Sequence, residues 1–183
     1  RAQRHYKKLL EADPNWVNAQ NRLGYIAMAQ GKFEEAEEAF LKYHYVAPDQ
    51  ANPHDSMGEL LTLLGRYDEA AVAFEKALEI DPEFCLAYYH LSDMYIMAGN
   101  FEPVPGVIER AEQHCAPSFV EIIECEAALW KDFMHDAENA FTEARSECRQ
   151  SALEYGRFIL HLLAIETGRF DIATEVEANL RKQ

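Results

Sequence analysis

The sequence predicts an all-α fold built from helical pairs that repeat along the chain. Residues that break helices recur every 34 positions. They are Pro14, Pro48 and Pro82 at one position of the period and Gly31, Gly65 and Gly99 at another. The stretch AMAQGKFEEAEEAF, residues 27–40, returns one period later as LTLLGRYDEAAVAF, residues 61–74. Apolar residues between these markers are spaced by three and four, which is typical of amphipathic helices. Such a period indicates units that each pack on their neighbours.

Each period has room for two helices. In the unit 49–82, residues 52–64 form the first predicted helix, which ends at Gly65 because glycine readily adopts the positive φ of a helix end. Residues 68–80 form the second, which Asp81-Pro82 ends because the residue before a proline avoids the helical region. Small residues are predicted to let the paired helices approach closely, and they are Gly24, Gly58 and Ser92.

The motif Leu-Gly, then Gly-x-Phe/Tyr-x-x-Ala, then Phe and Pro at a 34-residue period resembles the tetratricopeptide repeat family. The resemblance implies a right-handed α–α superhelix, or solenoid, of about five to six helix-turn-helix units. We expect one array over residues 1–183. Its units are a half unit at 1–14, followed by 15–48, 49–82, 83–117, 118–150 and 151–183.

Two stretches depart from this pattern. In the unit 83–117, Pro103 and Pro105 stand where the second helix would begin. That helix is therefore expected to start late, near Val107, or to be bent. Asn52-Pro53 suits a helix start, with Asn52 as the cap and Pro53 in the first turn.

The composition restricts the classes of partner. The chain has 17 basic and 32 acidic residues, and its net charge of -15 repels phosphate backbones and anionic lipid surfaces. We therefore expect neither nucleic acid nor membrane as a partner. No apolar run approaches the ~20 residues of a membrane span, and the start RAQRHYKKLLEADP lacks the apolar centre of a signal peptide. A cytoplasmic location is expected.

The first residue and the cysteines carry two further expectations. Because the chain starts at Arg1, we expect it to be a fragment of a longer protein. No C-x-x-C pair occurs among Cys85, Cys115, Cys125 and Cys148, and free, buried thiols are favoured over disulfides.

The first helix of each unit is expected to line the inner, concave wall of the array. On a helical wheel of residues 18–29, Asn21 and Tyr25 fall on the side opposite Leu23 and Ala27, which pack on the partner helix. The 34-residue period transfers the groove positions to later units. The predicted groove residues are Asn21, Tyr25, Asp55, Glu59, Tyr89, His90, Asp93 and Met97.

The side chains at these positions predict the kind of ligand. Asp55, Glu59 and Asp93 favour a neutral to basic or apolar peptide, because carboxylates attract Lys and Arg through charge-assisted hydrogen bonds. The alternative is that they form a solvated acidic face. Family members that grip the C-terminal carboxylate of chaperone tails use Lys, Arg and Asn; the lysines are missing here, and only Asn21 and Arg22 remain, so that ligand is not favoured.

No set of residues predicts catalysis, since no nucleophile, base or cofactor motif converges. His90 with Asp93 and His54 with Asp55 would suit a surface metal site, but such spacings arise easily by chance, and solvated or hydrogen-bonded side chains are favoured over a metal. We expect no catalytic residue, metal or cofactor. The predicted function is a non-catalytic protein–protein interaction module. The alternative is an oligomerisation, scaffold or regulatory segment of a larger protein, self-associating through its terminal repeats.

Overall fold

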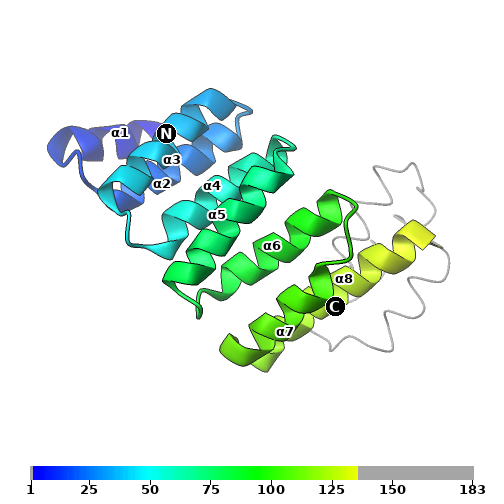
Figure 1. Cartoon of the computed structure of the whole chain (residues 1–183). Coiled ribbons are helices and arrows are strands. Elements are labelled where there is room, and N and C mark those ends of the chain that lie inside the picture. The colour runs from blue at the N-terminus through cyan, green and yellow to red at the C-terminus, as the bar shows by residue number, and fades with distance from the viewer. Residues whose placement is uncertain (1, 136–183) are drawn as a thin grey trace, which may run out of the picture. The chain divides into compact units, whose positions relative to one another are not determined.

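The computed structural model describes residues 2–135, and within them every regular element is an α-helix (Figure 1). The helices are α1 (Ala2–Ala12), α2 (Val17–Met28), α3 (Phe33–Val46), α4 (Ala51–Leu63), α5 (Tyr67–Ile80), α6 (Cys85–Met97), α7 (Val104–His114) and α8 (Pro117–His135). The all-α repeat prediction is confirmed. The last part of the predicted fifth unit, from residue 136 on, and all of the sixth lie outside the described residues.

The chain forms two compact units, residues 1–103 and 104–183. In the first, α2 packs on α3 and α4 on α5, and these hairpins lie side by side in chain order (Figure 1). Helix α4 also contacts α2 and α6, so the first helices of successive pairs are neighbours. In the described part of the second unit, α7 packs on α8.

The helix ends lie where the repeat predicts them. Helices α4 and α5 begin and end within one residue of the expected 52–64 and 68–80. Gly31, Gly65 and Gly99 follow α2, α4 and α6 with φ of 69°, 71° and 71°. This left-handed conformation is costly for residues with a Cβ, which explains why glycine recurs there.

The periodic small residues allow helices within a pair to touch. A Cβ added to Gly24 would lie 2.3 Å from the ring of Phe40, and one added to Gly58 would lie 2.5 Å from the ring of Phe74. Both rings are almost completely buried. Close approach at these glycines is therefore confirmed, and it lets each phenylalanine pack over the backbone of the preceding helix.

Two predictions concerned helix starts. Helix α7 does start late, because the period from Phe33 and Tyr67 points to Phe101, but it begins at Val104 rather than near Val107. Pro105 is tolerated in its first turn because the N–H that a proline lacks has no helical partner there. The prediction of Asn52 as a cap was wrong. Asn52 does not cap α4, which begins at Ala51 with Gln50 at the cap position and no side-chain cap bond. The Asn52 side-chain oxygen instead accepts hydrogen bonds from neighbouring helices, as described below.

The prediction of free thiols was also wrong. Cys85, Cys115 and Cys125 are disulfide-bonded, and no described cysteine is free. Disulfide formation depends on the distance between Cβ atoms in space, which the spacing along this sequence does not reveal. Separately, no helix in the described range 2–135 combines the length and the apolar character that crossing a lipid bilayer requires.

Candidate functional site

The predicted groove residues lie along α2, α4 and α6, and the surface that these three helices share is called here the groove face. Tyr25, Glu59 and Asp93 occupy equivalent repeat positions on the three helices. Because α4 contacts both α2 and α6, side chains at equivalent positions reach one another across the helices. The repeat thus places polar groups from three units in one cluster.

Tyr25 on α2 connects to α4 through its hydroxyl group. This hydroxyl donates a hydrogen bond to the carboxylate of Glu59 and lies 3.1 Å from the Ser56 hydroxyl. The Tyr25 ring packs edge-on against Phe40, with centroids 5.2 Å apart. Tyr25 is therefore fixed at both ends, by an aromatic contact and by a charge-assisted hydrogen bond.

His90 on α6 bridges two carboxylates of α4. Its Nδ1 lies 2.9 Å from Asp55 Oδ1, and its Nε2 lies 3.9 Å from Glu59 Oε2. The side chain of Asp55 is only 2% exposed, and that of His90 is 18% exposed. A charged imidazole donates from both nitrogens, so this placement suits a protonated His90 held between two acids.

The electrostatics of the cluster agree with this geometry. Burial opposes a charged His90, but the hydrogen bond to Asp55 and the charges of Asp55, Glu59 and Asp93 outweigh it, so the pKa of His90 is raised. Burial raises the pKa values of Glu59 and Asp93, although the charge of His90 opposes both shifts. Burial and the charge of Glu59 raise the pKa of Tyr25 far above its ordinary value. Several groups with displaced pKa values in one place are typical of functional sites.

A pH-dependent stability follows from His90. Its raised pKa means that its contribution to the free energy of unfolding is complete below the ordinary histidine pKa of 6.5 and is lost as the pH rises through the raised value. The groups that face it are Asp55, Glu59 and Asp93. We expect His90→Gln to cost more stability near pH 6 than near pH 9, with each unit of pKa shift worth about 1.4 kcal/mol. Urea unfolding at the two pH values measures the difference.

His54 provides the matched control. Burial lowers its pKa, so this histidine favours the unfolded state when protonated. His54→Gln should therefore cost less stability near pH 6 than near pH 9, the opposite of His90→Gln. An equal cost of His90→Gln at both pH values would contradict the account of His90 as a charged bridge.

A second set of hydrogen bonds converges on Asn52. Its Oδ1 accepts from Asn21 Nδ2 at 3.1 Å, from the Tyr43 hydroxyl at 3.1 Å and from the Ser56 hydroxyl at 3.2 Å. These donors come from α2, α3 and α4. We call these four residues the Asn52 set. Their hydrogen bonds hold α2, α3 and α4 in register beside the cluster of Tyr25, Glu59 and His90.

A small pocket opens next to Glu59, His90 and Asp93. Its volume is about 210 Å³, and its lining combines these groups with apolar side chains: Met28, Glu59, Thr62, Leu63, Phe74, His90, Asp93 and Met97. Leu63 and Met97 are 52% and 45% exposed at its rim. The Asp93 carboxylate accepts no hydrogen bond from any described residue. The pocket thus joins an apolar wall to two carboxylates, of which that of Asp93 has no hydrogen-bond donor among the described residues.

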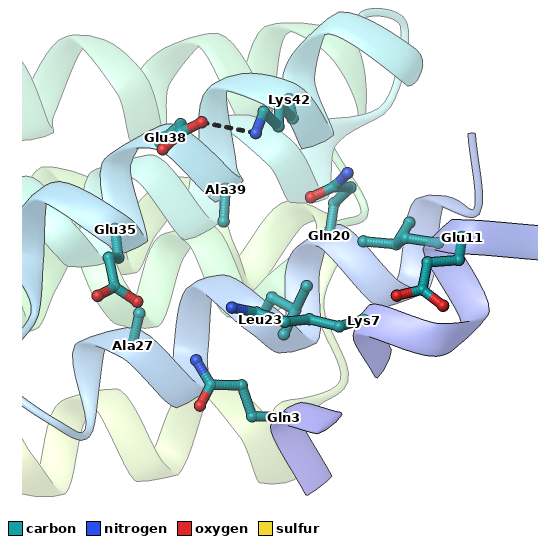
Figure 2. A pocket seen from close by; sticks show the side chains of 11 residues that line it. Gln3, Lys7, Glu11, Gln20, Leu23, Ala27, Glu35, Glu38, Ala39 and Lys42 are labelled. Carbon is teal, nitrogen blue, oxygen red and sulfur yellow. Dashed lines mark hydrogen bonds and ion pairs between the residues drawn. The ribbon is translucent and has the colours of Figure 1, made fainter. Parts of the chain in front are cut away.

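A larger pocket of about 570 Å³ lies between α1, α2 and α3 (Figure 2). It uses Gln20, Leu23 and Ala27, the stripe of α2 opposite to the groove positions. Figure 2 shows the ion pair between Lys42 and Glu38 on its wall, and both side chains are more than half exposed. Exposed pairs of this kind contribute little energy. We favour the smaller pocket as the functional site because it gathers half-buried groups with displaced pKa values.

The structure brings together most of the residues that the sequence singled out. Tyr25, Asp55, Glu59, His90 and Asp93 form one cluster. Three other predicted residues lie around it: Met97 in the pocket wall, Tyr89 against the His90 ring at 5.5 Å, and Asn21 in the Asn52 set. The sequence reasoning missed four residues, which are Met28, Tyr43, Thr62 and Phe74. For Phe74, its periodic match with Phe40 was a usable signal, since both face a glycine of the preceding helix.

Asp55, Glu59 and His90 also present metal-ligating atoms that all lie within 4.8 Å of one another. In the arrangement described above, however, His90 directs a different ring nitrogen to each carboxylate, and its contact with Asp55 has the length of a hydrogen bond. This arrangement suits a proton on each nitrogen. The expectation that no metal is held here stays a prediction.

Comparisons with known proteins point to one family. Residues 17–83 match the family model described as tetratricopeptide repeat. No curated protein sequence matches the chain.

Solved structures share the fold. A tetratricopeptide repeat protein from Parabacteroides merdae is 21% identical, with a TM-score of 0.63 over 87% of this chain and 62% of its own. PilW, a type IV pilus biogenesis factor, is 23% identical, with a TM-score of 0.64 over 97% of this chain and 82% of its own. YrrB, described as a TPR protein with an unusual peptide-binding site, is 14% identical, with a TM-score of 0.56 over 93% of this chain and 88% of its own. With its helical repeat and the family match over residues 17–83, the chain is similar to the tetratricopeptide repeat proteins.

Proposed function

We propose that this protein is a non-catalytic interaction module that binds an extended peptide or a helix of a partner protein on the groove face. Tetratricopeptide repeat proteins generally mediate protein–protein interactions. The observation that carries the proposal is the pocket of Glu59, His90 and Asp93 with the exposed Leu63 and Met97 at its rim. Large exposed side chains beside a concave polar site are typical of binding surfaces.

The proposed ligand is neutral to basic or apolar. The chain carries a net charge of -15, and the pocket holds two carboxylates, so an acidic segment would be repelled. Besides Leu63 on α4 and Met97 on α6, Leu86 on α6 is an exposed apolar side chain, at 46% exposure. Apolar contacts along α4 and α6 would supply affinity, and the carboxylates would select the charge of the ligand.

Selection of displayed peptides against the full chain tests this function. Selected peptides should lose roughly tenfold or more in affinity when Met97→Glu introduces a charge at the rim of the pocket. Val72→Glu is the matched control, because Val72 is 71% exposed on the second helix α5. Titration calorimetry measures the dissociation constants. A failure to select any peptide, or an equal loss in the Val72 variant, would overturn the proposal.

A further inference from the structure

We propose that the pocket between α2, α4, α5 and α6 receives one Lys or Arg side chain of the bound segment, with Glu59 and Asp93 as its charge acceptors. The inference rests on the proposed function and names the residue class that the groove face recognises. The pocket surrounds such a side chain with Met28, Leu63 and Met97 along its length.

The size of the pocket fits a single side chain. Its 210 Å³ falls below the roughly 300–1,000 Å³ of pockets that enclose whole small molecules. It is open to solvent at Leu63 and Met97, so a side chain can enter from a segment that lies across the groove face. Lys and Arg combine a long methylene stem with a charged head, which matches an apolar wall with an acidic floor.

The charges select a cation over an apolar side chain. Asp55, Glu59 and Asp93 face one His90, so three carboxylates against one imidazolium leave two negative charges when all four are ionised. An apolar occupant would remove water from Glu59 and Asp93 and give no hydrogen bond in return. A Lys or Arg head donates to both acceptors, including the Asp93 carboxylate that has no donor among the described residues.

The apolar wall argues against a bare metal ion as the occupant. A divalent cation requires several oxygen or nitrogen ligands around it, whereas Met28, Leu63, Phe74 and Met97 supply none. The two ring nitrogens of His90 are directed at Asp55 and Glu59. A side chain in the pocket leaves both contacts in place. A metal ion bound to His90 would instead displace the proton from one of the two ring nitrogens and break its contact with the carboxylate.

The bound cation and the proton on His90 should compete. Both are positive charges attracted by Glu59 and Asp93, so each weakens the binding of the other. A Lys or Arg side chain in the pocket therefore lowers the pKa of His90, and its affinity rises with pH as His90 loses its proton.

The test uses the full chain with ¹³C-methyl-labelled methionine and small probes. N-acetyl-lysine methylamide and its arginine analogue are titrated, with the norleucine analogue as the uncharged control. Saturable shifts are expected at the methyl groups of Met28 and Met97, whereas the buried Met94, which does not line the pocket, stays unchanged. Asp93→Asn should weaken lysine binding roughly tenfold. Asp68→Asn, on exposed α5 surface, should leave it unchanged.

Three results would overturn the inference. These are equal shifts with the norleucine probe, unchanged lysine affinity in Asp93→Asn, and Zn²⁺ alone saturating the His90 ring signal while the lysine probe moves no pocket methyl. Peptide selection remains an independent measurement. If selected peptides still bind and still lose affinity in Met97→Glu, the proposed function stands without the basic side-chain pocket.

Discussion

Replacing Phe74 with Ala is expected to lower the free energy of unfolding by about 3–5 kcal/mol, the range measured for large aromatic residues in protein cores. Phe74 is 1% exposed. Its ring packs over the backbone of Gly58 on α4 and lies 5.9 Å from the His90 ring on α6. One side chain therefore holds together both helices of its pair and the first helix of the next pair.

Urea unfolding measures this effect, and Val72→Ala is the control on the same helix. Val72 is 71% exposed, so its truncation should change stability by no more than about 0.5 kcal/mol. The Gly58→Ala variant adds a second check, since its new methyl group would strike the Phe74 ring. Gly58→Ala should be better tolerated when Phe74 is already Leu. A loss of stability below about 1 kcal/mol for Phe74→Ala would mean that the contacts of its ring do not hold α4, α5 and α6 together.

Replacing Asp55 with Ala is expected to cost about 3–5 kcal/mol, because removing one member of a buried charge pair leaves the other without its partner. Asp55 is 2% exposed and lies 2.9 Å from His90 Nδ1. Without it, the pKa of His90 should fall, since the hydrogen bond to Asp55 is the largest effect that favours its charged form. Equilibrium unfolding gives the energy, and a proton NMR titration of the His90 ring gives the pKa.

The matched variant is Asp55→Asn. Its amide oxygen can still accept a hydrogen bond from His90 Nδ1, but its negative charge is gone. It should therefore cost less than Asp55→Ala and still lower the pKa of His90. If the pKa of His90 stayed the same in both variants, the assignment of Asp55 as its partner would be wrong.

The helical repeat could be predicted because it depends on spacing along the chain. Gly65 and Asp81-Pro82 end α4 and α5 through local backbone preferences, and both ends were placed within one residue. Gly58 was predicted as a close contact from its period alone, and the ring of Phe74 fills the space that its missing Cβ leaves.

The groove face could be predicted only in part. The period placed Tyr25, Glu59 and Asp93 on one face because it repeats the orientation of each first helix. It did not show that His90 bridges two carboxylates, or that Asn52 accepts bonds from α2 and α3 instead of capping α4. These contacts depend on distances between helices. The disulfides of Cys85, Cys115 and Cys125 were missed for the same reason.

The central claim is that a partner segment lies on the groove face of α2, α4 and α6. Hydrogen–deuterium exchange of the full chain, with and without a selected peptide, tests it most directly because it reports which helices the ligand protects. The account predicts slower exchange in peptides that cover α4 and α6, with little change in α3. Protection confined to α1 and α3, around the pocket of Lys7, Glu38 and Lys42, would contradict it.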